Sequence, residues 1–188
     1  MTPISYEQFG RQLVQQAVSP ERIRRELMSM FEKPTEGTVR KGKEMLVGEY
    51  VFTLDGIELD PIAARLPDVA MRLYIKGRLA LSVKIVGVSL RFTLQVTIRL
   101  HTVVKTYDPV VIRLETPEIG RDDIDLKVDP HDLRGGLLDK LNIIEPAVRD
   151  EIVEEVNLRI NSDEVRAAAT IDVLKLADQV SMGDAAAT

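Results

Sequence analysis

Cysteine and tryptophan are both absent from this sequence of 188 residues, and aromatic residues make up only 4% of it. Without cysteine the chain has no disulfide, no thiol nucleophile and no thiolate metal ligand. With so few aromatic residues, the core has to be built from leucine, valine, isoleucine and methionine. The lack of cysteine also fits a reducing compartment.

Long apolar runs are missing as well. No stretch of about 18 uncharged apolar residues occurs, so the sequence offers no membrane-spanning helix. The opening residues, MTPISYEQFGRQLVQQ, lack the basic stretch and apolar core of a secretory signal. We therefore expect a cytoplasmic protein, and peripheral attachment to a membrane stays open.

Motifs that would mark an active site or a metal site are absent too. The sequence has no P-loop, no dinucleotide-binding glycine pattern and no nucleophile elbow. His101 and His131 have no partner at a zinc-ligand spacing. A calcium loop starting at Asp123 would need glycine and glutamate where Val128 and Arg134 stand. We expect no catalytic residue, no metal and no cofactor, so an enzyme is not favoured.

Acidic residues are absent between Val69 and Tyr107, although the whole chain carries a net charge of −5. Residues 1–108 hold 16 Lys and Arg against 12 Asp and Glu, whereas residues 109–188 hold 9 against 18. The cations of the acid-free stretch that we expect on one face of a sheet are Arg72, Lys76, Arg78, Lys84, Arg91 and Arg99.

Several explanations of this basic face are open. The cations can form ion pairs within the protein, be solvated, be covered by the acidic C-terminal region, or contact an anionic membrane. A nucleic acid is not expected, because aromatic stacking residues are nearly absent and the isoelectric point is about 5.2.

Hydrophobic periodicity changes from helical to two along the chain. Val88–Leu100 alternates without a fault between apolar residues and polar or basic ones, which is typical of a strand with one buried face. We predict strands at Met45–Leu54, Val69–Ile85, Val88–Val104, Val110–Ile119 and Asp122–Val128. Asp55-Gly56 is read as a turn, DPIAARLP as one helical turn, and Val86-Gly87 as a bulge or tight reversal.

Helices are predicted before and after these strands. Ser5 to Gln8 has the form of a capping box, and Ser19-Pro20 starts a second helix that ends near Pro34. Further starts are predicted at Asp129-Pro130 and Glu145-Pro146, the latter helix running to Ile160. A box at 161–164 predicts one more turn to Ala169, and the segment 171–179 is ambiguous between strand and helix.

These elements predict one α+β domain over 1–188, a long coiled antiparallel β-meander wrapped against a long C-terminal helix. Its parts are N-terminal helices (1–33), an antiparallel sheet (37–128), C-terminal helices (129–178) and a frayed tail (179–188). A strand of 17 residues spans roughly 56 Å, whereas a helix of about 16 residues spans roughly 24 Å. The apolar face therefore needs a further cover: the N-terminal helices, curling of the sheet, a second subunit or a hydrocarbon ligand.

This organisation of the predicted strands and of the helix Glu145–Ile160 resembles the tubular lipid-binding (TULIP-like) superfamily, in its single-module bacterial type. That group includes the bactericidal/permeability-increasing proteins and the synaptotagmin-like mitochondrial lipid-binding domains. The resemblance covers roughly residues 37–161 and rests on shape, because the family has no short motif. The expected small residues of a roomy groove are few, with Gly77 and Gly87 the main ones.

The resemblance implies a non-enzymatic protein that binds lipid or another hydrophobic ligand in an apolar groove between sheet and helix. The implied groove residues are Leu73, Ile75, Leu79, Leu81, Val83, Leu90, Phe92, Leu94, Val96, Ile98, Ile152 and Val156. Two alternatives stay open. One is a structural protein that self-associates, for example as a homodimer, through strands or amphipathic helices. The other is a small enzyme that acts on a hydrophobic substrate.

Overall fold

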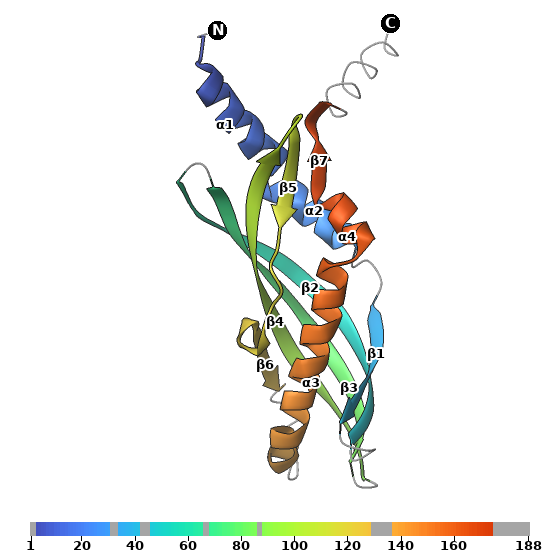
Figure 1. Ribbon diagram of the computed structural model, residues 1–188. Coiled ribbons are helices and arrows are strands. Elements are labelled where there is room, and N and C mark those ends of the chain that lie inside the picture. Colours follow the sequence, from blue (N-terminus) through green and yellow to red (C-terminus); the bar gives the residue numbers. More distant parts are fainter. Residues whose placement is uncertain are drawn as a thin grey trace, which may run out of the picture.

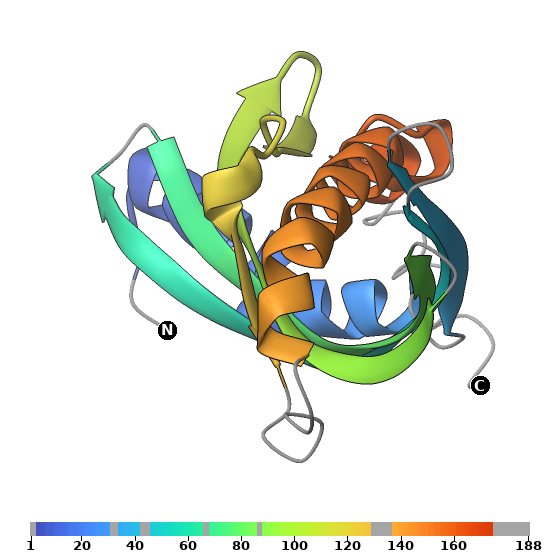
Figure 2. The same cartoon turned by 90° about the horizontal axis from the view of Figure 1, so that it is seen from below.

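The computed structural model describes residues 3–30, 34–41, 46–65, 68–85, 88–128 and 137–174. They form a curled antiparallel sheet, two short N-terminal helices and a long C-terminal helix, α3 (Leu137–Ile160) (Figure 1). Seen from below, the sheet is a curved gutter and α3 lies along its inside (Figure 2). The predicted α+β class is confirmed.

The two N-terminal helices begin where their capping residues predict. In α1 (Tyr6–Ala17), the amide of Gln8 donates to Ser5 Oγ and the amide of Ser5 donates to Gln8 Oε1, both at 3.2 Å. These two bonds form the expected capping box. In α2 (Pro20–Met30), proline is the first helical residue, and Ser19 Oγ accepts from the amide of Arg22 at 3.4 Å.

Within the described residues, seven strands form one sheet in the order β1-β2-β3-β4-β5-β7, and β6 pairs with β4 beside β5. Every pairing is antiparallel. The strands are β1 (Thr35–Lys41), β2 (Leu46–Arg65), β3 (Asp68–Ile85), β4 (Val88–Tyr107), β5 (Val111–Glu115), β6 (Ile124–Val128) and β7 (Thr170–Asp172). The predicted reversal at residues 86–87 lies outside the described residues.

The sheet differs from the sequence prediction in four places. Asp55-Gly56 is not a turn: β2 continues through it with a shift in register between Leu54 and Gly56, as at a β-bulge. The segment DPIAARLP is not helical, because β2 runs on to Arg65 against β3. The strand predicted to reach Ile119 ends at Glu115. No strand was predicted over β1, whose residues pair with β2.

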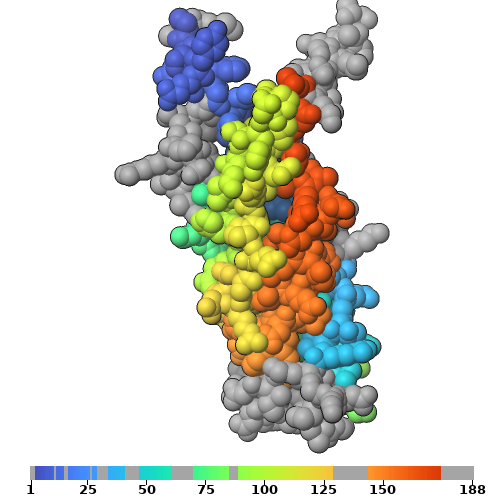
Figure 3. Space-filling model, viewed as in Figure 1, coloured from blue at the N-terminus to red at the C-terminus, as the bar shows by residue number. Residues whose placement is uncertain are grey.

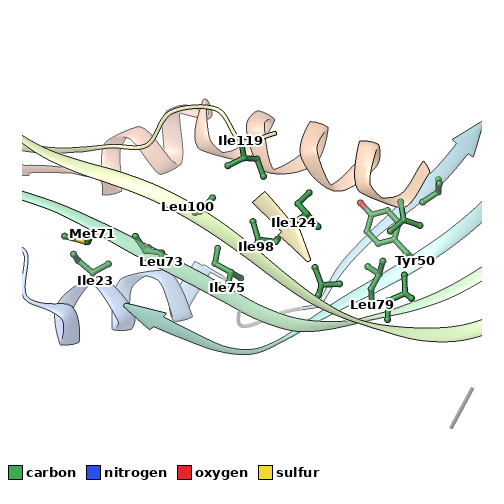
Figure 4. Packing of buried hydrophobic residues seen from close by; sticks show 14 of the residues in the cluster. Ile23, Tyr50, Met71, Leu73, Ile75, Leu79, Ile98, Leu100, Ile119 and Ile124 are labelled. Atoms are coloured by element: carbon green, nitrogen blue, oxygen red, sulfur yellow. The ribbon is translucent and has the colours of Figure 1, made fainter. Parts of the chain in front are cut away.

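The alternation predicted for the strands Val69–Ile85 and Val88–Val104 is confirmed. In β3 and β4, apolar residues of one parity are buried on the inner side of the gutter, where they face α3 and α2 (Figure 4). Their polar and basic neighbours are exposed on the outer, convex side, as Arg72, Arg91 and Arg99 illustrate. The core is aliphatic, and its most buried members include Leu79, Leu94, Val96, Ile144 and Val148.

Helix α3 is longer than predicted. Its 24 residues span about 36 Å, and Pro146 lies inside it, so the predicted restart at Glu145-Pro146 is wrong. Ile144, Ala147 and Val148 are at most 4% exposed, and burial on both sides of the proline holds the helix together there. The start predicted at Asp129-Pro130 lies outside the described residues.

Side chains of α3 also fasten the segment that precedes β6. Asn157 accepts from the amide of Ile119 at 2.9 Å and donates to its carbonyl at 3.1 Å. Arg149 donates to the carbonyls of Arg121 and Ile124 and forms an ion pair with Glu145 at 2.7 Å. These bonds tie the inside of the gutter to the edge formed by β6.

The chain beyond α3 returns to the sheet. The helical turn predicted to run from the box at 161–164 to Ala169 is present as α4 (Asp163–Ala168), where Ser162 Oγ accepts from the amide of Val165 at 3.3 Å. The ambiguous segment then adds β7 to the free side of β5. As a result α4 and β7 lie opposite α2, across the inner face of β4 and β5 (Figure 1).

Candidate functional site

Most residues that the resemblance implied for a groove lie in the packed core under α3. Leu79, Leu94 and Val96 are at most 2% exposed. Ile75, Leu81, Val83, Phe92 and Ile98 belong to the same buried cluster, and Leu90, Ile152 and Val156 pack against it. Of the twelve, Leu73 also lines a hollow. Ligand contact stays a prediction for all twelve.

The hollow lies toward the end of the gutter at which α3 stops, at Ile160. It has a volume of about 1440 Å³ and is bordered by α2, by the ends of β3 and β4, by β5, and by the chain from Ile160 through β7. Ordinary small-molecule pockets measure about 300–1,000 Å³, so this space exceeds their range. Figure 3 shows the surface hollowed between the yellow-green segment around β5 and the orange-red segment of α4.

Aliphatic side chains from four elements form the floor of this hollow. Helix α2 contributes Ile23 and Leu27, β3 contributes Leu73, β4 contributes Leu100, and the end of α3 contributes Ile160. Figure 4 places Ile23 next to Leu73 and Met71. The floor therefore continues the inner face of the sheet beyond the region that α3 covers.

One polar pair interrupts the apolar floor. Thr102 is 2% exposed and follows the buried parity of β4, and its hydroxyl is 2.8 Å from the hydroxyl of Thr116. Both residues line the hollow. Because each hydroxyl has the other as partner, the pair is stable without a ligand and still offers a lone pair to one.

Small side chains keep the hollow open. Residues 167–169 are three alanines, at the end of α4 and just after it, and all of them border the space with Ala17 of the N-terminal segment. The glycines in which the sequence suggested room do not provide it. A Cβ at Gly77 would lie 2.5 Å from the Phe52 ring, so that ring occupies the space, and Gly87 lies outside the described residues. The run RAAAT was the signal that sequence reasoning missed.

Charged residues surround the hollow in an unequal ratio. Among the described residues, four cations line it, Arg22, Lys105, Arg113 and Arg166, against two carboxylates, Glu115 and Asp172. Lys105 Nζ lies 2.7 Å from Glu115 Oε2, and Tyr107 donates its hydroxyl hydrogen to Glu115 as well. The bond from Lys105, followed by that from Tyr107, lowers the pKa of Glu115 below its usual value. The bond to Glu115 raises the pKa of Tyr107.

These bonds limit what chemistry the hollow can perform. Glu115 is held ionised by two donors, so it is a poor general base. His101 lies exposed on the outer side of β4 and does not line the space, and His131 lies outside the described residues. Among the described residues no group of His, Asp and Glu is arranged to hold a metal ion. The described lining thus combines an aliphatic floor with charged side chains that mostly have partners within the protein.

The basic residues predicted to share one face do lie together on the convex side. Some of them already have partners: Lys76 Nζ is 2.7 Å from Glu58 Oε1, Arg78 Nε is 3.0 Å from Asp55 Oδ1, and Arg99 donates to the Asp122 carbonyl. Within the described part of the chain, Arg72, Lys84 and Arg91 form no ion pair.

The expected internal pairing is thus confirmed for two of the six cations. The acids of β2 supply it, and α3 lies on the opposite side of the sheet from these cations (Figure 2). Among the described helices, none is both long enough and apolar enough to cross a membrane.

The chain was compared with known proteins by sequence. No protein-family model matches it, and no curated protein matches it.

Proposed function

We propose that this protein binds a lipid or another hydrophobic ligand, without catalysis, in the hollow between the sheet and the helices α2 and α4. The observation that carries the proposal is a space of about 1440 Å³ with an aliphatic floor. The hollow is open at the surface, so its aliphatic floor stays exposed to water unless an apolar ligand covers it, and covering apolar surface is favourable.

The magnitude of the hydrophobic effect supports an acyl chain as the occupant. Each methylene that leaves water contributes about 0.8 kcal/mol, so ten methylenes contribute about 8 kcal/mol before the costs of association. Those costs take several kcal/mol, and the remainder corresponds to weak or moderate affinity. Polar groups at the border of the hollow can supply additional binding free energy.

The fold is consistent with a TULIP-like module, in which a coiled meander is wrapped against a long helix. Here α3 lies along the inside of a curled sheet, and the hollow is where that helix ends. On this proposal the packed core under α3 acts as a rigid body that holds the hollow open, and the ligand occupies the end that contains α2.

The convex face supplies a second part of the proposal, contact with an anionic membrane. Lys84 and Arg91 are diagonal neighbours across β3 and β4, since Lys84 is opposite Ser89 and Arg91 is opposite Ser82. Neither is neutralised by a carboxylate among the described residues. Exposed cations near an anionic surface contribute about 1 kcal/mol each to binding.

The ligand proposal is tested by filling the hollow. Ala168 borders the hollow from α4 and is exposed, so Ala168→Trp adds bulk without disturbing the core. Ala80→Trp places the same side chain on the exposed outer face of β3 and is the matched control. Uptake of a fluorescent fatty acyl probe should weaken in the first variant only.

Native mass spectrometry and organic extraction of the purified protein provide the direct measurement. A co-purifying lipid, or saturable uptake of the probe, is the expected result. A wild-type protein that carries no lipid and takes up no probe would refute the proposal.

Self-association is a second candidate, favoured by α1. Tyr6 is 97% exposed and Phe9 is 56% exposed, and Ile4 just before the helix is 48% exposed. The helix projects from one end of the molecule (Figure 1). Light scattering decides whether a stable oligomer forms, and a monomer across the working concentration range would remove this candidate.

A further inference from the structure

We infer that the ligand of the hollow is an anionic amphiphile, whose negative end is held by Arg22 while its hydrocarbon chain lies on the aliphatic floor. This inference rests on the proposed function and adds to it the chemical class of the ligand. It follows from the charges that line the hollow and from the partners that each of those charges already has.

The two carboxylates of the lining are already engaged. Glu115 is bound by Lys105 at 2.7 Å and by the hydroxyl of Tyr107. Asp172 Oδ1 accepts from the amide of Leu174 at 3.1 Å, and Asp172 has a further partner. With four cations against two acids among the described residues, this part of the lining keeps an excess of positive charge. The chain as a whole carries −5, so this excess is a local property of the hollow.

Three of the four cations also have partners inside the protein. Lys105 is paired with Glu115, the guanidinium of Arg113 lies 5.3 Å from the centre of the Tyr107 ring, and Arg166 donates to Asn161 Oδ1 at 3.1 Å. Within the described residues, the side chain of Arg22 has no hydrogen bond and no ion pair. Arg22 is therefore the cation that a ligand can bind at least cost.

Its position suits that role. Arg22 is half-buried and directly precedes Ile23, which is 7% exposed and belongs to the floor. A partly buried guanidinium without an anion is unfavourable, and binding one removes the penalty. The planar fork of arginine also matches the two oxygens of a carboxylate or phosphate. An amphiphile can thus place its anion at Arg22 and its chain on Ile23, Leu27 and Leu73.

The test compares two ligands that share one hydrocarbon chain and differ in their polar end, which is charged in one and neutral in the other. Oleate and oleyl alcohol are titrated separately against a fluorescent acyl probe bound to the full-length protein. The wild-type protein should bind oleate roughly 10- to 150-fold more tightly, because a hydrogen bond to a charged group contributes roughly 1.5–3 kcal/mol. Arg22→Gln should remove that preference and leave the affinity for the alcohol unchanged.

A matched control separates this site from the general effect of losing a charge. Arg24→Gln removes the same charge from an exposed position of the same helix that does not line the hollow. It should keep the preference for oleate, and Arg22→Lys should keep part of it. Thermal unfolding of each variant shows whether the fold is intact.

The outcomes distinguish the inference from the proposed function. Equal binding of oleate and the alcohol, or an unchanged preference in Arg22→Gln, would overturn the inference and leave hydrophobic binding standing. Failure of both ligands to displace the probe would overturn both. A third titration, with a lysophospholipid that carries a phosphate monoester, shows whether the bound anion is a carboxylate or a phosphate, and either result supports an anionic ligand.

Discussion

Gly77 and Gly10 show how differently one methyl group acts at two positions. A Cβ at Gly77 would lie 2.5 Å from the Phe52 ring and 2.6 Å from the Thr53 carbonyl oxygen, whereas a Cβ at Gly10 meets nothing within 4 Å. The Thr53 oxygen is backbone, so the strand itself would have to move. The aromatic ring of Phe52 covers Gly77 across the strand pair, as aromatic residues often do beside strand glycines.

We expect Gly77→Ala to lower the free energy of unfolding by about 1–3 kcal/mol, the usual cost of overpacking a core. Gly10→Ala should raise it or leave it unchanged, because alanine favours a helix by about 1 kcal/mol over glycine. Urea denaturation of both variants provides the measurement. A stable Gly77→Ala protein would contradict the close approach of Phe52 to β3.

At the residue scale the sequence predicted burial well and contacts poorly. The alternation of apolar and polar residues predicted which side of β3 and β4 is buried, because successive residues of a strand point to opposite faces. It did not tell that Phe52 fills the space next to Gly77, since those two residues meet only through the register of β2 and β3. It also gave no reason to single out Arg22, whose role depends on what surrounds it in space.

Among the elements, the side-chain amide of Asn157 is one of the groups that join α3 to the segment before β6. Asn157 both accepts from and donates to the backbone of Ile119, a residue that is 7% exposed. Replacing it with alanine leaves two largely buried backbone groups without partners. We expect Asn157→Ala to lower the free energy of unfolding by about 1–3 kcal/mol.

Glu154→Ala is the control for this prediction, because Glu154 is exposed on the same helix. It should change stability by less than about 0.5 kcal/mol. Thermal and urea unfolding measure both effects. Equal stabilities of the two variants would mean that the contact between Asn157 and Ile119 does not hold the edge in solution.

Local signals predicted element types better than element ends. The capping residues Ser5 and Ser19 marked helix starts that the structure contains, and the box at 161–164 marked the start of α4, although its capping residue is Ser162 and not the first residue of the box. Asp55-Gly56 and Glu145-Pro146 were misread, because pairing with β3 and packing against the core overrode a turn signal and a helix-start signal. Strand β1 was missed because TEGTVRK is short and polar, and its pairing with β2 is a tertiary contact.

For the whole molecule, the sequence posed the question of how the long apolar face is covered. The structure answers it in parts: α3 covers one end, α2 and α4 flank the other, and a hollow lies between these two helices. The hollow was not predictable, because its lining comes from segments more than a hundred residues apart, such as Ile23 and Ile171. The basic face was predictable, because it follows from alternation along two neighbouring strands.

The convex face yields the last prediction, on membrane binding. Lys84→Gln with Arg91→Gln removes two cations that have no carboxylate partner among the described residues. Binding to vesicles that contain phosphatidylglycerol should weaken roughly thirtyfold, from about 1 kcal/mol per cation. Arg24→Gln with Arg25→Gln removes the same charge from exposed positions of α2, outside that face, and should weaken binding far less. Vesicle flotation at two salt concentrations measures both, and equal losses in the two double variants would mean that the convex face is not the contact surface.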